Sequence, residues 1–266
     1  VAIGYQSLDA AIVSDNNTAI GHQSLSALAS NNETGNNVAV GYQAGLILNH
    51  TTSAVDNVLI GSGAGVAATT LGSSVIIGKG AVGTGTTLTA ADGSVAIGAG
   101  AAAALTIGLG TTVVGFQAGA ALTEGLGNTA IGYQSLLTEA ANGDQNTAIG
   151  YQTLKVMAAD TNTHGQNTAL GYHAGVGLTF GIKNTIIGAL AGTADITGDS
   201  NTIVGHDAGD VITSGTLNTI IGDGANPSAA GASNQTVIGQ GTTGISDNSV
   251  VLGNASVTDV FMASDK

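Results

Sequence analysis

Pairs of apolar residues recur along the whole chain, and each pair is followed directly by a glycine. A typical copy reads Asn201-Thr202-Ile203-Val204-Gly205. The closing glycine, called the marker glycine below, occurs at fifteen places: Gly4, Gly21, Gly41, Gly61, Gly78, Gly98, Gly115, Gly132, Gly150, Gly171, Gly188, Gly205, Gly222, Gly239 and Gly253. The steps between them run from 14 to 21 residues. A period of this length, held from end to end, predicts a solenoid rather than a series of globular domains.

Both apolar positions are filled in every copy. The residue directly before the marker glycine is always a large aliphatic, and the residue before that one is always apolar. Because neighbouring residues on a strand point to opposite faces, both faces of this strand are expected to be hidden from water. We take the residue next to the glycine as the core position and expect the earlier one to meet another copy of the chain. The candidates for that contact are Ala130, Ala148, Ile186, Ile203 and Ile220.

The other positions of each copy predict turns. Asn usually stands four residues before the marker glycine, where its amide can fix a turn or stack into an amide ladder. A weaker apolar pair such as Leu178-Thr179 follows in the shorter copies and predicts a second short strand. The fold class is therefore an all-β parallel β-roll, or β-solenoid, of about fifteen coils of 14 to 21 residues. Residues 1–253 are the repeat region, and residues 254–266 look like an exit from it.

Composition supports this interpretation and excludes several classes of partner. With 43 Gly, many Thr, Asn, Val and Ile residues and only 8 % charged residues, helix is disfavoured. A net charge of −13 without any arginine leaves nothing to attract nucleic acid or an anionic membrane surface. The chain has no cysteine and no run of 18 apolar residues that would predict membrane insertion. It starts inside a copy of the repeat, so we expect it to be a fragment.

A column of aromatic residues and histidines is the strongest candidate for a binding surface. In eight copies the residue after the marker glycine is one of these: Tyr5, His22, Tyr42, Phe116, Tyr133, Tyr151, Tyr172 and His206. Gln follows in six of the copies. Aromatic and amide groups suit a saccharide, so the column could bind sugars. The simpler alternative is that a repeated residue stacks on itself from coil to coil.

We expect no metal, no cofactor and no catalytic site. The five histidines, His22, His50, His164, His173 and His206, do not occur at a metal-ligand spacing. Asp207, Asp210 and Asp223 fall in neighbouring coils but lack the glycine-rich calcium-binding pattern. Asp195 and Asp199 give no sign of acid–base chemistry, and the glycines of Gly61-Ser62-Gly63-Ala64-Gly65 have no lysine or helix after them to hold a phosphate.

Two copies resemble a known family. Ser94-Val95-Ala96-Ile97-Gly98-Ala99-Gly100-Ala101 and Asn248-Ser249-Val250-Val251-Leu252-Gly253 resemble the head repeats of trimeric autotransporter adhesins of the YadA type. Copies that read Asn-Thr-Ala-Ile-Gly-Tyr-Gln are similar to repeats in the tail fibres of tailed phages. The resemblance covers nearly the whole chain and implies a left-handed β-roll in which three chains pack side by side. The adhesin step of about fourteen residues occurs here only between Gly239 and Gly253, which implies larger turns.

The sequence thus leads to a non-enzymatic rod or head of a homotrimeric extracellular fibre that attaches to a cell surface. The fibre would belong to a phage virion or to a bacterial surface, and its receptor would be a surface glycan or a protein. One alternative is an acyltransferase on a left-handed β-helix, although hexads do not recur between Gly205 and Gly222. Another is an ice-binding solenoid, favoured by Thr168, Thr185, Thr202 and Thr219. Val in other copies, and the placement of this column on the face assigned to the core, count against ice binding.

Overall fold

The computed structural model of the chain describes residues 1–10, 16–28, 35–48, 55–83, 92–138, 145–157 and 165–260. Regular secondary structure in these ranges consists of strands alone, one before each marker glycine. The strands are β1 (Ala2–Ile3), β2 (Thr18–Ile20), β3 (Val38–Val40), β4 (Val58–Ile60), β5 (Val75–Ile77), β6 (Val95–Ile97), β7 (Thr112–Val114), β8 (Thr129–Ile131), β9 (Thr147–Ile149), β10 (Thr168–Leu170), β11 (Thr185–Ile187), β12 (Thr202–Val204), β13 (Thr219–Ile221), β14 (Thr236–Ile238) and β15 (Val250–Leu252).

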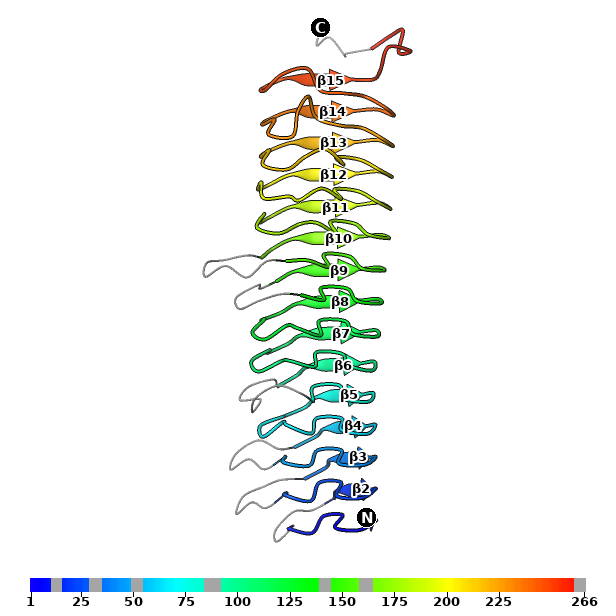
Figure 1. The fold of residues 1–266 in the computed structure, drawn as a ribbon, viewed down its shortest axis with the longest axis vertical. Coiled ribbons are helices and arrows are strands. Elements are labelled where there is room, and N and C mark those ends of the chain that lie inside the picture. The colour runs from blue at the N-terminus through cyan, green and yellow to red at the C-terminus, as the bar shows by residue number, and fades with distance from the viewer. Residues whose placement is uncertain are drawn as a thin grey trace, which may run out of the picture.

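All the strands belong to one parallel sheet. They are ordered β1 to β15 exactly as in the sequence, so each strand pairs with the one before it and the one after it. Equivalent residues lie side by side; Thr185 pairs with Thr202 and Ile186 with Ile203. Figure 1 shows the strands one above another along a rod, with the N-terminus and the C-terminus at opposite ends. The prediction of an all-β parallel β-solenoid is confirmed.

The structure corrects the prediction of which strand face is the core. In β2 to β14 the middle residue is buried inside the coil, while its two neighbours point outward. Ile203 and Ile220, expected to meet another chain, are fully buried in the chain's own core. The residue next to the marker glycine, expected to be the core, lies instead on the outer face, as Ile221 does. The two faces were therefore assigned the wrong way round.

The interior is filled by residues of complementary size. The buried middle residue of the strand faces the residue four places after the marker glycine. When that second residue is Leu, as with Leu136, the strand supplies only Ala130. When the strand supplies Ile203, the second residue is Gly209, and a Cβ there would lie 3.0 Å from Ile203 Cγ2. In other coils both positions are small, as with Ala169 and Gly175, and side chains of the neighbouring coils fill the space, as close packing requires.

A ladder of asparagine side chains runs through the corner before each strand. Asn201 Oδ1 accepts bonds from Asn218 N at 3.1 Å and Asn218 Nδ2 at 3.0 Å. Asn218 Nδ2 also donates to Ala232 O in the same coil at 2.7 Å. The asparagines of this column are almost fully buried, so the ladder satisfies polar groups that water cannot reach. The predicted amide ladder is confirmed.

The marker glycines turn the chain where neighbouring coils are closest. Gly205 has φ +141°, and a Cβ on it would lie 2.5 Å from Gly222 O in the next coil. No side chain fits at that distance, and the backbone conformation itself is one that residues with a Cβ rarely adopt. The glycine therefore permits both the turn and the close stacking of coils.

The second side of the coil is less regular than predicted. Within the described residues it contains isolated bridges, such as Leu178 with Ile196 and Ile107 with Glu124, in place of the expected short strands. The apolar residues predicted for the second strand are nevertheless buried, and Leu178 and Ile196 both belong to the core. After β15, residues 254–260 add no strand, and Asn254 Nδ2 donates back to Gln240 O at 2.7 Å.

Candidate functional site

Large aliphatic side chains line the outer face of the sheet. They come from the position directly before the marker glycine, and equivalent residues of successive strands lie in register. Seven of them are 36 to 45 % exposed: Ile20, Ile60, Ile131, Leu170, Ile221, Ile238 and Leu252. The others of this column between β3 and β12 are half-buried. The column, called the outer aliphatic column below, forms a continuous apolar strip along the rod.

A second column runs beside it, two residues earlier in each strand. It is Val in β3 to β6 and Thr in eight successive strands, β7 to β14. These threonines are Thr112, Thr129, Thr147, Thr168, Thr185, Thr202, Thr219 and Thr236. Because this column points outward together with the outer aliphatic column, the objection that it faces the core is wrong. The hydroxyls lie on the surface, one per strand.

The five candidates for contact with another chain do not reach this surface. Ala130, Ala148, Ile186, Ile203 and Ile220 are all 0 % exposed within a single chain. Another chain cannot cover side chains that the coil already encloses. Their outward neighbours, one residue later in each strand, are the residues available for such a contact.

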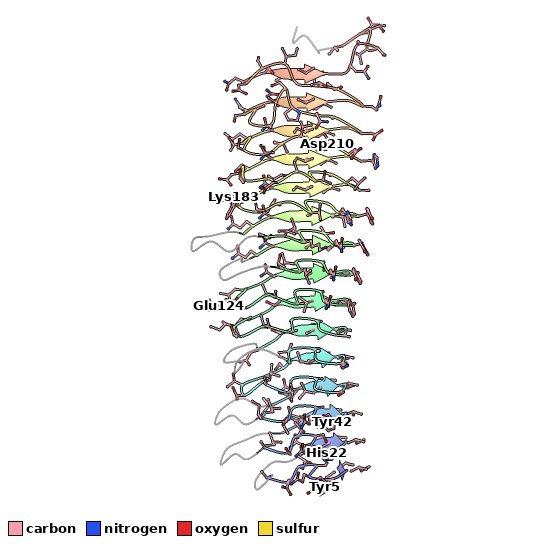
Figure 2. The ribbon with its side chains drawn as sticks, viewed as in Figure 1. Tyr5, His22, Tyr42, Glu124, Lys183 and Asp210 are labelled. Carbon is pink, nitrogen blue, oxygen red and sulfur yellow. The ribbon has the colours of Figure 1, made fainter. Side chains whose placement is uncertain are left out.

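The aromatic column forms two separate stacks. Tyr5, His22 and Tyr42 make the first, with ring centroids 5.2 and 5.4 Å apart. Figure 2 shows these three residues in successive coils at the N-terminal end of the rod. The second stack runs from Phe116 through Tyr133 and Tyr151 to Tyr172, and the centroids of neighbouring rings are 5.0 to 5.4 Å apart. The stacks support the alternative that a repeated residue stacks on itself from coil to coil, because within a stack each ring covers the face of the next.

His206 stands apart from both stacks. Its Nδ1 lies 3.0 Å from Asp223 Oδ1 in the next coil, and both side chains are well exposed. A further ring that the sequence reasoning missed, His173, lies against Tyr172 with centroids 4.1 Å apart. It occupies the position where other coils have Gln, so an alignment of the copies could have found it.

The glutamines beside the stacks form ladders of their own. Gln43 Nε2 donates to Gln23 Oε1 at 2.9 Å, and Gln23 Nε2 donates to Gln6 Oε1 at 2.9 Å. Gln134 and Gln152 continue the same pattern from Gln117. In every link the amide donates toward the N-terminal end of the rod. Each ladder therefore leaves a side-chain carbonyl unused by the ladder at its C-terminal end and a side-chain N–H unused by the ladder at its N-terminal end.

Both columns are interrupted in the same three coils, which the sequence reasoning did not notice. Between the two stacks the aromatic position holds Ser62, Lys79 and Ala99. The glutamine position holds Gly63, Gly80 and Gly100. These six residues are called the three-coil gap below. The signal was present in the sequence, because all three coils lack both side chains.

Asp195 and Asp199 have structural partners in the turns, whereas Asp210 Oδ1 is buried without a hydrogen-bond partner among the described residues. Asp199 Oδ1 accepts a bond from Ile182 N at 2.9 Å, and Asp195 accepts one from the Thr179 hydroxyl. Over the ranges that the structure describes, no three His, Asp or Glu side chains gather as a metal site would require. His50 and His164 lie outside these ranges. In the same ranges, no helix is long and apolar enough to cross a bilayer.

No protein-family model matches the chain, and no curated protein matches it in sequence. The conclusions on function therefore depend on the outer surface of the rod itself.

Proposed function

We propose that the chain is a non-enzymatic rod of a homotrimeric extracellular fibre that mediates attachment to a cell surface. The observation that carries the proposal is the outer aliphatic column, which exposes large apolar side chains on strand after strand. A monomeric soluble protein rarely exposes a continuous apolar surface of this extent, and such surfaces commonly mark contacts with another chain.

A second copy of the chain is the partner that this surface fits best. The column repeats once per strand, so a partner with the same repeat can contact every coil in the same way. Another copy of this chain has that repeat, and closed rotational symmetry then satisfies all copies equally. Three chains in a left-handed roll are what the resemblance to adhesin heads and phage fibres implies. The first and third residues of each strand would form the contact.

The repeated surface suits a structural role better than a reaction. The same residue types face outward in nearly every coil, whereas a catalytic centre needs a particular set of groups at one place. A rod with few charges and a net charge of −13 also suits an extracellular setting, where nonspecific attraction to anionic surfaces would be a disadvantage. Both a phage tail fibre and a bacterial surface adhesin fit this description.

Charged substitutions in the outer aliphatic column test the proposal. We expect the double variant Ile131→Asp with Ile221→Asp to run at the mass of one chain, because two desolvated carboxylates per chain oppose assembly. The matched control is Leu217→Asp, which changes a leucine that is 62 % exposed but lies outside the strands. It should keep three chains together. Equal masses for the two variants, at the same concentration, would refute a contact through this column.

Ice binding is a second candidate for the same face. The eight threonines from β7 to β14 point outward at one hydroxyl per strand, spaced by about 4.8 Å, which makes a flat and regular polar array. Thermal hysteresis of the purified chain tests it, with Thr168→Lys and Thr202→Lys as disruptive variants. Hysteresis that both variants abolish, shown by a monomeric chain, would favour ice binding over the fibre.

A further inference from the structure

We propose that the three-coil gap is a binding site for a short acidic oligosaccharide. This ligand would serve the attachment role, on which the proposal rests. The two aromatic stacks end on either side of the gap, at Tyr42 and Phe116.

The ends of the stacks present open ring faces. Tyr42 is covered by His22 on the side of the N-terminal coil, and Phe116 is covered by Tyr133 on the side of the C-terminal coil. The other face of each ring is directed toward the gap, where the equivalent residues are Ser62 and Ala99. Tyr42 and Phe116 are 52 and 48 % exposed, more than Tyr133 and Tyr151 inside the second stack. An open ring face attracts the C–H groups of a sugar ring through its negative quadrupole.

The amides at the two ends complement the ring faces. Gln43 Nε2 is bonded to Gln23, while Gly63 in the next coil has no side-chain amide to donate to Gln43 Oε1. Gln117 Oε1 accepts from Gln134, while Gly100 in the preceding coil has no side-chain carbonyl to accept from Gln117 Nε2. One end of the gap thus offers a hydrogen-bond acceptor and the other a donor. Sugar hydroxyls can pair with both.

The glutamine position is open in the first two coils of the gap. A Cβ on Gly80 would meet no atom within 4 Å, and one on Gly63 would meet only Val66, at 3.9 Å. Four inter-strand steps separate Tyr42 from Phe116, which is about 19 Å at the usual spacing of parallel strands. This length suits a short oligosaccharide rather than a single sugar.

Lys79 gives the site its preference for an acidic sugar. It is exposed in the middle coil of the gap, and the chain has only four basic residues of the Lys and Arg type. Among the described residues, the ion pair is that of His206 with Asp223, and Lys79 is paired with no carboxylate there. A uronate carboxylate reaching this ammonium would form a charge-assisted hydrogen bond.

Calorimetric titration with trigalacturonate, and with its methyl ester as the neutral probe, tests the site. We expect the acid to bind the unmodified chain at least about tenfold more tightly than the ester, the effect of one charge-assisted hydrogen bond. Lys79→Gln should remove that difference and leave ester binding unchanged. Equal binding of the two probes to the unmodified chain, or no binding of either, would overturn the inference.

A variant that fills the gap provides the sharper test. Ser62→Tyr with Gly63→Gln places in this coil the residues that Tyr42 and Gln43 already occupy one coil earlier, so the fold should tolerate both changes. Gly63 has φ +69° and Gln43 has φ +55°, so the backbone there already suits Gln. We expect the extended stack to cover the open face of Tyr42 and to abolish binding of both probes.

The matched control extends the other stack away from the gap. Ala189→Tyr with Leu190→Gln adds the same two side chains beyond Tyr172, and both probes should then bind as they do to the unmodified chain. If the filled variant binds as well as this control, the gap is not the site. The mass of each protein in solution separates the two proposals: a trimer that binds neither probe refutes the sugar site alone, and a monomer that binds both probes in the expected manner refutes the fibre alone.

Discussion

The two faces of the same strands differ in how completely one chain satisfies them. On the inner face, Ile186, Ile203 and Ile220 are fully buried, and each is accommodated within its own coil and by the coils next to it. On the outer face, Ile221 and Ile238 are equally apolar but remain 36 and 38 % exposed. The inner face therefore accounts for the fold of one chain, whereas the outer face is the one that the proposed assembly would cover.

This difference predicts that inner substitutions act on folding at any concentration and that outer substitutions act on assembly. The largest loss of stability should come from a substitution at a point where the backbones of neighbouring coils lie close together. Gly205→Val places a branched side chain where even a Cβ would lie 2.5 Å from Gly222 O. We expect the free energy of unfolding to fall by about 4 kcal/mol or more, measured by denaturant titration with circular dichroism.

The control for this substitution is another glycine with positive φ. Gly224 has φ +61°, and a Cβ on it would meet nothing within 4 Å. Gly224→Asn should change stability by less than about 1 kcal/mol, since Asn tolerates this conformation. Comparable losses at both glycines would show that close stacking of coils is not the cause.

The next largest effect should come from the inner column. Ile203→Ala leaves a cavity beside Gly209, which cannot fill it, and should cost about 2 to 5 kcal/mol. Its neighbour on the outer face, Val204, is half-buried in one chain. Val204→Ala should cost less than about 1 kcal/mol in a dissociated chain. The free energy of unfolding, measured at two protein concentrations, checks this. Only the loss caused by Val204→Ala should be larger at the concentration where the chains assemble.

A smaller loss is expected from the buried amide ladder. Asn201→Ala removes the acceptor used by Asn218 N and Asn218 Nδ2, and also the donor to Gly215 O at 2.8 Å. Leaving such groups without partners should cost about 1 to 3 kcal/mol. The control is Asn234→Gly, because Asn234 donates to Asn248 on the exposed side and glycine tolerates its φ of 53°. An Asn234→Gly loss as large as that of Asn201→Ala would contradict a structural role for burial of the ladder.

The smallest effect should come from the outer threonine column. Thr202→Val keeps the shape of the side chain, and Val occupies the same position in β3 to β6. We expect a change below about 0.5 kcal/mol and no loss of assembly. Differential scanning calorimetry and the mass in solution measure the two quantities. Dissociation of this variant would show that the hydroxyls, rather than the apolar side chains, hold the chains together.

The sequence predicts the coils well because their period is carried by residues that the backbone requires. The marker glycine is needed where Gly205 approaches Gly222, and Asn218 is needed to satisfy the corner before its strand. The identity of the core face was missed because both columns are apolar. A partial signal was available: the inner residue is always Ala where its partner is Leu, as Ala130 with Leu136, whereas the outer residue stays large throughout.

The candidate site was only half visible from the sequence. The column through Tyr133 could be found by aligning the copies, but its stacking decides what the rings can bind. Inside a stack the ring faces are covered by neighbouring rings, so Tyr133 has no open face for a sugar. Tyr42 and Phe116 lie at the stack ends, and each keeps one open face. That distinction depends on ring orientation, which a sequence pattern does not carry.

The mass of the unmodified chain in solution tests the central claim most directly. The outer aliphatic column predicts an assembly with three times the mass of one chain, measured by light scattering after size-exclusion chromatography and unchanged on moderate dilution. A monodisperse species with the mass of a single chain, stable across the same dilution, would contradict it, since the exposed outer face would then be tolerated by water.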